Sequence, residues 1–170
     1  MAAPACNTRR YAPQKMNKEE IKLHVELVFG GNAAPENYTN RDHCPECAEH
    51  DETLRSHTPQ SIGLEQLGNP GWDPICFVLP EAFKYYFPAL VRLALDSEGS
   101  NGNLDQFLFH VTYQGEDSRF FKHFSQAERE ATLEVLHYIE SHMGRLVHEW
   151  NLENDIKEAL WLWKKLVDSA

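Results

Sequence analysis

A chain of 170 residues with 42% hydrophobic and 25% charged residues is long enough to bury a globular core without disulfide staples. Its formal net charge of −10 argues against nucleic acid as a partner, because binding to phosphates requires Lys and Arg clustered on one face. No apolar run approaches the roughly 18 residues that a membrane-spanning helix needs, and the N-terminus lacks the apolar core of a secretory signal. We therefore expect a cytoplasmic, acidic protein that binds neither membranes nor nucleic acid.

The first residues contain prolines and show no hydrophobic periodicity, so we expect a flexible N-terminal arm over 1–16 and a single helical domain over 17–170. Asn17 and Glu20 have the spacing of a capping box, in which each side chain satisfies a backbone N–H at a helix start. Apolar residues then recur at helical spacing as far as Gly30, which predicts the first helix.

Beyond a polar loop, a proline suited to a first helical position predicts a helix from Pro45 to about Ser56. A connection rich in proline and glycine follows over 56–74, with one short helical turn around Leu64–Leu67. Connections of this length without regular structure are uncommon and often carry function.

The most apolar region, residues 75–96, has a proline in the middle of a helical pattern. The ring of Pro88 clashes with the preceding turn and its nitrogen donates no hydrogen bond. We therefore expect two short helices, over 81–86 and 88–96. A short strand over 75–79 is the competing interpretation of the first residues.

Three further helices are expected, over 104–113, from Ser125 to Gly144, and over about 152–167. The second of these begins at another capping box, formed by Ser125 and Glu128, and continues with apolar residues at i, i+4 spacing. The predicted fold is mainly α: an irregular bundle of about five to six helices joined by long loops, with one short strand as an alternative.

The segment "RDHCPECAEHDE" carries the strongest chemical signal in the sequence. Cys44, Cys47 and His50 form a Cys-x-x-Cys-x-x-His pattern at the start of the second predicted helix, which places them near one face. Thiolates and imidazoles are the ligands that zinc prefers, and a structural zinc site has four of them. We therefore predict a metal ion bound by these three residues, with zinc preferred and nickel, copper(I) and iron left open. The candidates for the fourth ligand are His43, Cys6, Cys76 and a histidine from a distant helix.

Two enzymatic interpretations of this segment stay open, beside the simple case of packed side chains without a ligand. The pair Cys44 and Cys47 could form a thiol oxidoreductase site, although the preceding residues lack the strand that such a helix usually follows. A zinc-dependent hydrolase would instead keep the fourth position for water, with Glu46, Glu49 or Asp51 beside it. Without that role, we expect these acidic residues on the helix surface.

The favoured function is a small metal-binding domain that acts as an accessory or interaction protein with a protein partner. Small size, acidity and aromatic content also fit an immunity-like or antitoxin-like partner protein. The sequence decides neither whether the protein is an enzyme nor its oligomeric state.

Residues outside the cysteine segment carry weaker signals. His110 and His123 flank an aromatic-rich segment, in which we expect both to be structural. Asp73 has no identifiable partner, so a solvated or helix-capping role is expected.

Two stretches resemble one known family. Residues 72–95, "WDPICFVLPEAFKYYFPALVRLAL", have a Trp that leads into an apolar stretch and a helix with a "PEaFrYYlPA" core. Residues 123–142, "HFSQAEREATLEVLHYIESH", have Phe-Ser before a long helix. Both are similar to motifs of an uncharacterised bacterial family of domains of unknown function. The resemblance implies a small bacterial cytosolic domain and no known reaction. The "HCPEC" segment looks like a feature of a subset of that family, so the resemblance does not establish a metal site.

Overall fold

The computed structural model describes residues 16–99 and 101–169, over which the chain is mainly helical. The α-helices are α1 (Lys18–Phe29), α2 (Pro45–Arg55), α3 (Leu64–Leu67), α4 (Pro80–Leu95), α5 (Leu104–Thr112), α6 (Gln126–His142), α7 (Gly144–Glu149) and α8 (Glu153–Asp168). Short 3-10 helices are η1 (Pro70–Trp72), η2 (Pro74–Phe77), η3 (Gly115–Asp117) and η4 (Phe121–His123). The mainly α prediction is confirmed, although the helices outnumber the five to six expected.

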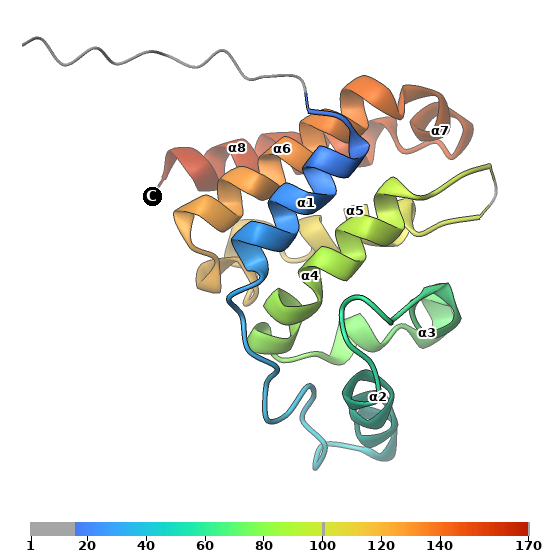
Figure 1. Cartoon of the computed structure of the whole chain (residues 1–170), viewed down its shortest axis with the longest axis vertical. Coiled ribbons are helices and arrows are strands. Elements are labelled where there is room, and N and C mark those ends of the chain that lie inside the picture. The colour runs from blue at the N-terminus through green and yellow to red at the C-terminus, as the bar shows by residue number, and fades with distance from the viewer. Residues whose placement is uncertain (1–15, 100, 170) are drawn as a thin grey trace, which may run out of the picture.

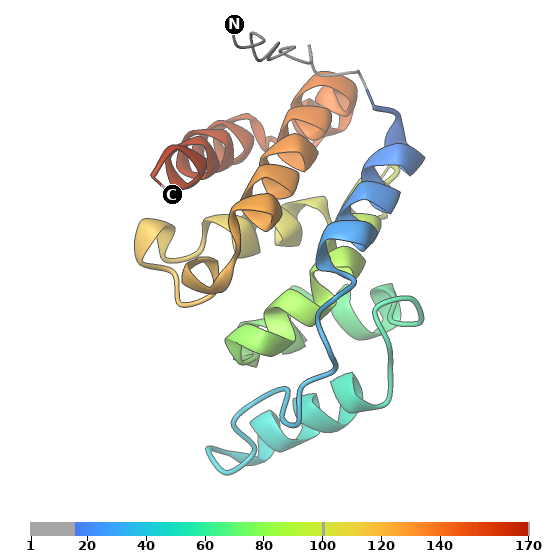
Figure 2. The same ribbon diagram turned by 60° about the vertical axis from the view of Figure 1, so that its left-hand side comes forward.

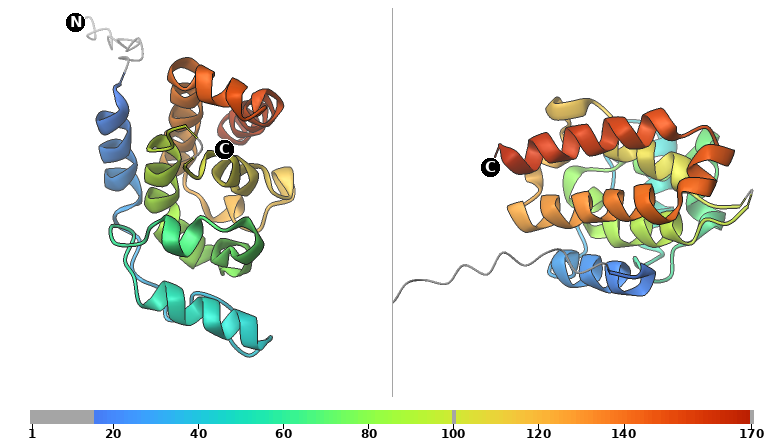
Figure 3. Two further views of the ribbon diagram at one scale, coloured as in Figure 1. Left: turned by 90° about the vertical axis from the view of Figure 1, so that its right-hand side faces the viewer. Right: turned by 90° about the horizontal axis from the view of Figure 1, so that it is seen from above.

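The helices are arranged so that α2, which begins in the segment containing Cys44 and Cys47, stands apart from the main bundle (Figure 1). α1, α6 and α8 lie side by side, with α6 in the middle and in contact with both neighbours (Figure 3). α4 packs against α1 and α5, and α5 packs against α8. α2 lies at the end of the molecule remote from α6 and α8, where it contacts η2 (Figure 2).

Both predicted capping boxes are present. Asn17 Oδ1 accepts a hydrogen bond from the Glu20 N–H at 3.1 Å, and the Glu20 carboxylate accepts one from the Asn17 N–H at 2.8 Å. Ser125 and Glu128 make the same reciprocal pair at the start of α6. Because these bonds satisfy N–H groups that have no partner within a helix, they fix where α1 and α6 begin.

The prediction of a break at Pro88 is wrong, because α4 runs through this residue without interruption. Pro88 and Lys84 are half-buried, whereas Tyr86 and Phe87 are fully buried. The carbonyl of Lys84, which loses its helical donor at Pro88, therefore lies on the more exposed face of the helix. Burial of the opposite face offsets the cost of the lost hydrogen bond.

Two short elements also differ from expectation. Residues 75–79 form no strand: most of them belong to η2, and Val78 makes one isolated antiparallel bridge with Thr39. The sequence does not predict α7, because Gly144 reads as a helix stop. Instead, Gly144 begins α7 directly after the C-cap of α6.

One contiguous cluster of buried apolar side chains extends from Ile21 in α1 to Trp163 in α8. The predicted N-terminal arm lies outside the described residues, apart from Met16. Within the described ranges, no helix has both the length and the apolar character needed to cross a membrane.

Candidate metal centre

The start of α2 brings two cysteines together. Cys44 is the N-cap residue, and its Sγ accepts a hydrogen bond from the Cys47 N–H at 3.3 Å. Pro45 occupies the first helical position, where a missing N–H costs no helical hydrogen bond. An N-cap side chain faces the third residue of its helix, so the Cys-x-x-Cys spacing becomes a close pair. The two Sγ atoms lie 3.2 Å apart.

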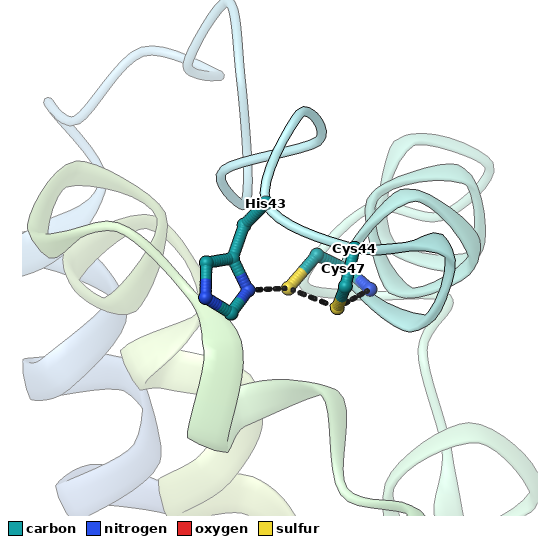
Figure 4. Close-up of side chains that lie close together, drawn as sticks. All are labelled: His43, Cys44 and Cys47. Carbon is teal, nitrogen blue, oxygen red and sulfur yellow. Dashed lines mark hydrogen bonds between the residues drawn. The ribbon is translucent and has the colours of Figure 1, made fainter.

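His43 joins these two thiols, and we call the three residues the thiol cluster (Figure 4). Its Nδ1 lies 3.5 Å from Cys47 Sγ, and one potential ligand atom from each residue lies within 4.8 Å of the other two. The imidazole points from the loop before α2 toward the sulfur atoms at the helix start. His43 is exposed, Cys44 half-buried and Cys47 buried, so the cluster is open to solvent on one side.

The cap geometry makes the two thiols electrostatically different. The Cys47 N–H, the Cys47 thiol and His43 all stabilise the Cys44 thiolate and lower the pKa of Cys44. The hydrogen bond with Cys44, together with burial, raises the pKa of Cys47. Cys44 is therefore the first of the two to ionise, as a metal ligand or a nucleophile requires.

Asp51 fixes the loop before α2 against the helix. Its Oδ1 accepts hydrogen bonds from the N–H groups of Tyr38 at 2.8 Å and Thr39 at 3.0 Å. Its Oδ2 pairs with Arg41 Nη1 at 2.8 Å and Arg55 Nη2 at 2.9 Å. Burial alone would raise the pKa of Asp51, but these N–H and guanidinium groups hold it below its ordinary value. The expectation that the acidic residues lie on the helix surface is wrong for Asp51, which is fully buried.

The structure does not bring His50, one of the three predicted zinc ligands, into the thiol cluster. One turn further along α2, its fully buried ring packs against Trp72 and Phe77, with ring centroids 4.7 Å and 4.6 Å away. Neither ring nitrogen has a hydrogen-bond partner within the described residues. Glu46 Oε1, 3.7 Å from Nε2, is too distant for one. The residue grouped with the two cysteines is His43, the first candidate for the fourth ligand.

The other cysteine candidates lie elsewhere. Cys6 is outside the described residues. Cys76 belongs to a second group, which we call the Cys76 cluster: it consists of Asp73, Cys76 and His110, again with potential ligand atoms within 4.8 Å of one another.

The expectation that Asp73 lacks a partner is wrong. Asp73 is buried and accepts a hydrogen bond from Gln106 Nε2 at 3.0 Å, and its Oδ2 lies 2.7 Å from His110 Nε2. The expected capping role is confirmed, because Oδ1 accepts the Ile75 N–H at the start of η2. Gln106 and His110, four residues apart and flanked by apolar residues in α5, are the sequence signal that could have suggested a buried polar partner.

The donor set of the thiol cluster suits a soft or borderline metal ion. Two sulfur atoms and one imidazole nitrogen are the ligand types of zinc sites, and they favour zinc or copper(I) over magnesium or calcium. Three protein ligands leave one tetrahedral position for water or a further ligand. The cluster can therefore hold a metal ion, and the residues alone do not fix which one.

No protein-family model, curated protein or solved structure matches the chain. The resemblance to an uncharacterised bacterial family therefore stays a prediction.

Proposed function

We propose that this protein is a small zinc-binding domain in which His43, Cys44 and Cys47 supply three ligands. The observation that carries the proposal is the convergence of their ligand atoms within 4.8 Å of one another. The lowered pKa of Cys44 supports it further, because zinc binds the thiolate and not the thiol. A bound ion would tie the exposed loop at His43 to the start of α2 and stabilise this end of the molecule.

The test is metal analysis of the untagged protein after purification in zinc-containing buffer and desalting. We expect about one equivalent of zinc in the wild type and less than about a tenth of an equivalent in Cys44→Ser/Cys47→Ser. Cys76→Ser is the matched control, because it removes a thiol outside the thiol cluster. Wild-type protein with less than about a tenth of an equivalent of any transition metal would overturn the proposal.

A thiol oxidoreductase is the second candidate, and one observation favours it. The half-buried Cys44 has a lowered pKa, and its Sγ is 3.2 Å from that of the buried Cys47, at the start of a helix. An exposed nucleophilic thiol followed by a buried second thiol is the arrangement of Cys-x-x-Cys redox sites. Equilibration of the metal-free protein with glutathione buffers, followed by mass analysis, measures whether a reversible Cys44–Cys47 disulfide forms at cellular potentials. If zinc-loaded protein forms this disulfide as readily, the redox function replaces the zinc function.

A zinc hydrolase has less support from the same cluster. A metal-bound water needs a nearby carboxylate as general base. Glu46 acts electrostatically on Cys47, but its Oε1 lies 3.7 Å from His50 Nε2, and Asp51 is already paired with Arg41 and Arg55. We therefore favour an accessory or interaction role over hydrolysis at this site.

An interaction role is consistent with the apolar surface. Large apolar side chains are exposed on separate helices, including Leu27 on α1 and Trp161 on α8, which are 74% and 62% exposed. Side chains of this kind favour contact with a protein partner. Neither the partner nor its place on the surface is specified by these residues.

A further inference from the structure

The Cys76 cluster offers a different set of donor atoms from the thiol cluster and is not used by the function proposed above. Asp73 is the N-cap of η2, Cys76 lies within η2, and His110 lies on α5. One carboxylate oxygen, one thiol sulfur and one imidazole nitrogen therefore converge from two segments, each within 4.8 Å of the other two. Asp73 and His110 are buried, whereas Cys76 is exposed and so gives an ion a route from solvent.

Asp73 and His110 are close to the separation that two ligands of one zinc ion require. Asp73 Oδ2 lies 2.7 Å from His110 Nε2. Two atoms bound to a tetrahedral zinc ion at about 2.0 Å are about 3.3 Å apart, so this pair would open by only about half an ångström. The ion would take the place of the hydrogen atom between the two atoms, and the neutral imidazole would carry its proton on Nδ1.

Two further hydrogen bonds orient the carboxylate without blocking the site. Oδ1 accepts the Ile75 N–H at 2.9 Å and caps η2, which leaves Oδ2 facing His110. Gln106 Nε2–H donates to the same Oδ2 at 3.0 Å, and a carboxylate oxygen has a second lone pair for an ion. Hydrogen bonds of this kind fix the carboxylates that bind metals in proteins. The ligand pair is thus preorganised by groups that keep their contacts when an ion binds.

We propose that the Cys76 cluster is a second zinc site, in which Asp73 Oδ2, Cys76 Sγ and His110 Nε2 are the ligands. Zinc suits this donor set because sulfur disfavours magnesium and calcium, and a carboxylate oxygen disfavours copper(I). The thiol releases its proton to solvent as the zinc–sulfur bond forms, and water fills the fourth tetrahedral position. Zinc at this site does not depend on zinc at the thiol cluster, because the two clusters share no residue.

Zinc should bind more weakly here than at the thiol cluster. The Cys76 cluster supplies one sulfur ligand where the thiol cluster supplies two, and the hydrogen bond between Asp73 and His110 is given up. Burial and, secondarily, the Asp73 carboxylate raise the pKa of the Cys76 thiol to about 11. The ion stabilises the thiolate by its own charge but still has to displace this proton. We therefore expect this zinc to be lost on desalting, whereas the thiol cluster retains its ion.

The experiment is an equilibrium titration of the untagged, full-length Cys44→Ser/Cys47→Ser protein with Co²⁺ under reducing, anaerobic conditions. Co²⁺ occupies zinc sites and gives an ultraviolet charge-transfer band when a thiolate binds it. We expect one equivalent to bind with this band, and added zinc to abolish the band by displacement. The additional change Cys76→Ser should remove the band. Cys6→Ser is the matched control, because it removes the other remaining thiol of the sequence and should leave the band unchanged.

The other two ligands are tested in the same background. Asp73→Asn keeps an oxygen atom to cap η2 but loses the charge, and His110→Phe removes the ring nitrogen atoms. Each should weaken Co²⁺ binding at least about tenfold. The absence of a charge-transfer band in Cys44→Ser/Cys47→Ser at Co²⁺ concentrations up to about 1 mM would overturn the proposal. So would a band that persists after Cys76→Ser.

Alkylation of the wild-type protein keeps the test decisive if a variant is destabilised. Zinc kept in excess in the solution should slow the modification of Cys76 by iodoacetamide at least about tenfold, measured by peptide mass spectrometry. Equal rates with and without zinc would overturn the second site. Zinc bound at the thiol cluster alone would protect Cys44 and Cys47 but leave Cys76 reactive, so failure of the second site is distinguishable from failure of the first.

Discussion

Replacing Asp51 with Asn tests how the thiol cluster is held together. Asn keeps an oxygen atom that can accept the Tyr38 and Thr39 N–H groups, which lie 2.8 Å and 3.0 Å from Asp51 Oδ1. At the other position, an amide N–H group would face the guanidinium groups of Arg41 and Arg55, now 2.8 Å and 2.9 Å from Oδ2. The substitution therefore removes two charge-assisted contacts and leaves the backbone contacts in place.

The cost follows from the burial of the two ion pairs. Hydrogen bonds to a charged group contribute about 1.5–3 kcal/mol each. The Asp51 side chain is fully buried, but the Arg41 and Arg55 side chains are 37% and 45% exposed, so solvent screening reduces both contributions by about half. We expect Asp51→Asn to lower the free energy of unfolding by about 2–3 kcal/mol. Because the loop that carries His43 is held by the same carboxylate, zinc affinity should fall by about tenfold or more.

The assays are urea unfolding of the metal-free protein and zinc competition with a chromophoric chelator. Glu49→Gln is the matched control: it removes one carboxylate charge from the exposed face of the same helix and should change stability by less than about 0.5 kcal/mol. Equal stability of Asp51→Asn and wild type near neutral pH would refute the positioning role of Asp51.

The pH dependence gives the same substitution a second readout. The pKa of Asp51 is lower in the folded protein than in the unfolded chain, so its charge stabilises the fold fully above the unfolded pKa, near about 4. This contribution is lost as the pH falls through the folded pKa. The difference in stability between wild type and Asp51→Asn should therefore shrink below about pH 4, and a difference that stays constant in acid would contradict it.

Three other predictions concern individual side chains. Iodoacetamide should alkylate Cys44 before Cys47, because the first thiol has the lower pKa and greater exposure, and bound zinc should protect both; peptide mass spectrometry measures the order. Phe87→Ala should cost about 3–5 kcal/mol in urea unfolding through the cavity it leaves, whereas Leu27→Ala at an exposed site should cost less than about 0.5 kcal/mol. His50→Phe should change the free energy of unfolding by less than about 1.5 kcal/mol, because it removes two unpartnered nitrogen atoms from an aromatic pocket. The zinc content should stay unchanged, and its loss would show that His50 is a ligand.

Sequence rules predict a structural feature correctly when all the residues that form it lie close together in the sequence. The capping boxes at Asn17 and Ser125 are visible in sequence because both halves of each box lie three residues apart. The uninterrupted α4 is not visible in this way. Whether Pro88 breaks a helix depends on which face its missing N–H occupies, and that face is set by burial against distant helices.

The same limit explains the choice between His43 and His50. Helical spacing places His50 three residues after Cys47 and near the same face, so a local rule selects it as the next ligand. The local rule does not show that Trp72 in η1 and Phe77 in η2, both distant from His50 in the sequence, pack against its ring. His43 precedes the helix, and its direction depends on the loop that Asp51 anchors. Periodicity describes side chains within a helix and cannot orient those before its start.

A buried aspartate positions the chemistry in both clusters. Asp51 ties the loop before α2 to the helix, and Asp73 caps η2 while holding His110. A buried carboxylate is costly unless several donors satisfy it, and once they do, their directions are fixed by the carboxylate. The donors come from segments separated in sequence, so each carboxylate converts tertiary contacts into a defined side-chain geometry. Substitution of either aspartate should therefore disturb its own cluster and leave the other intact. If one hydrogen-bond network connected both clusters, a single substitution would disturb both.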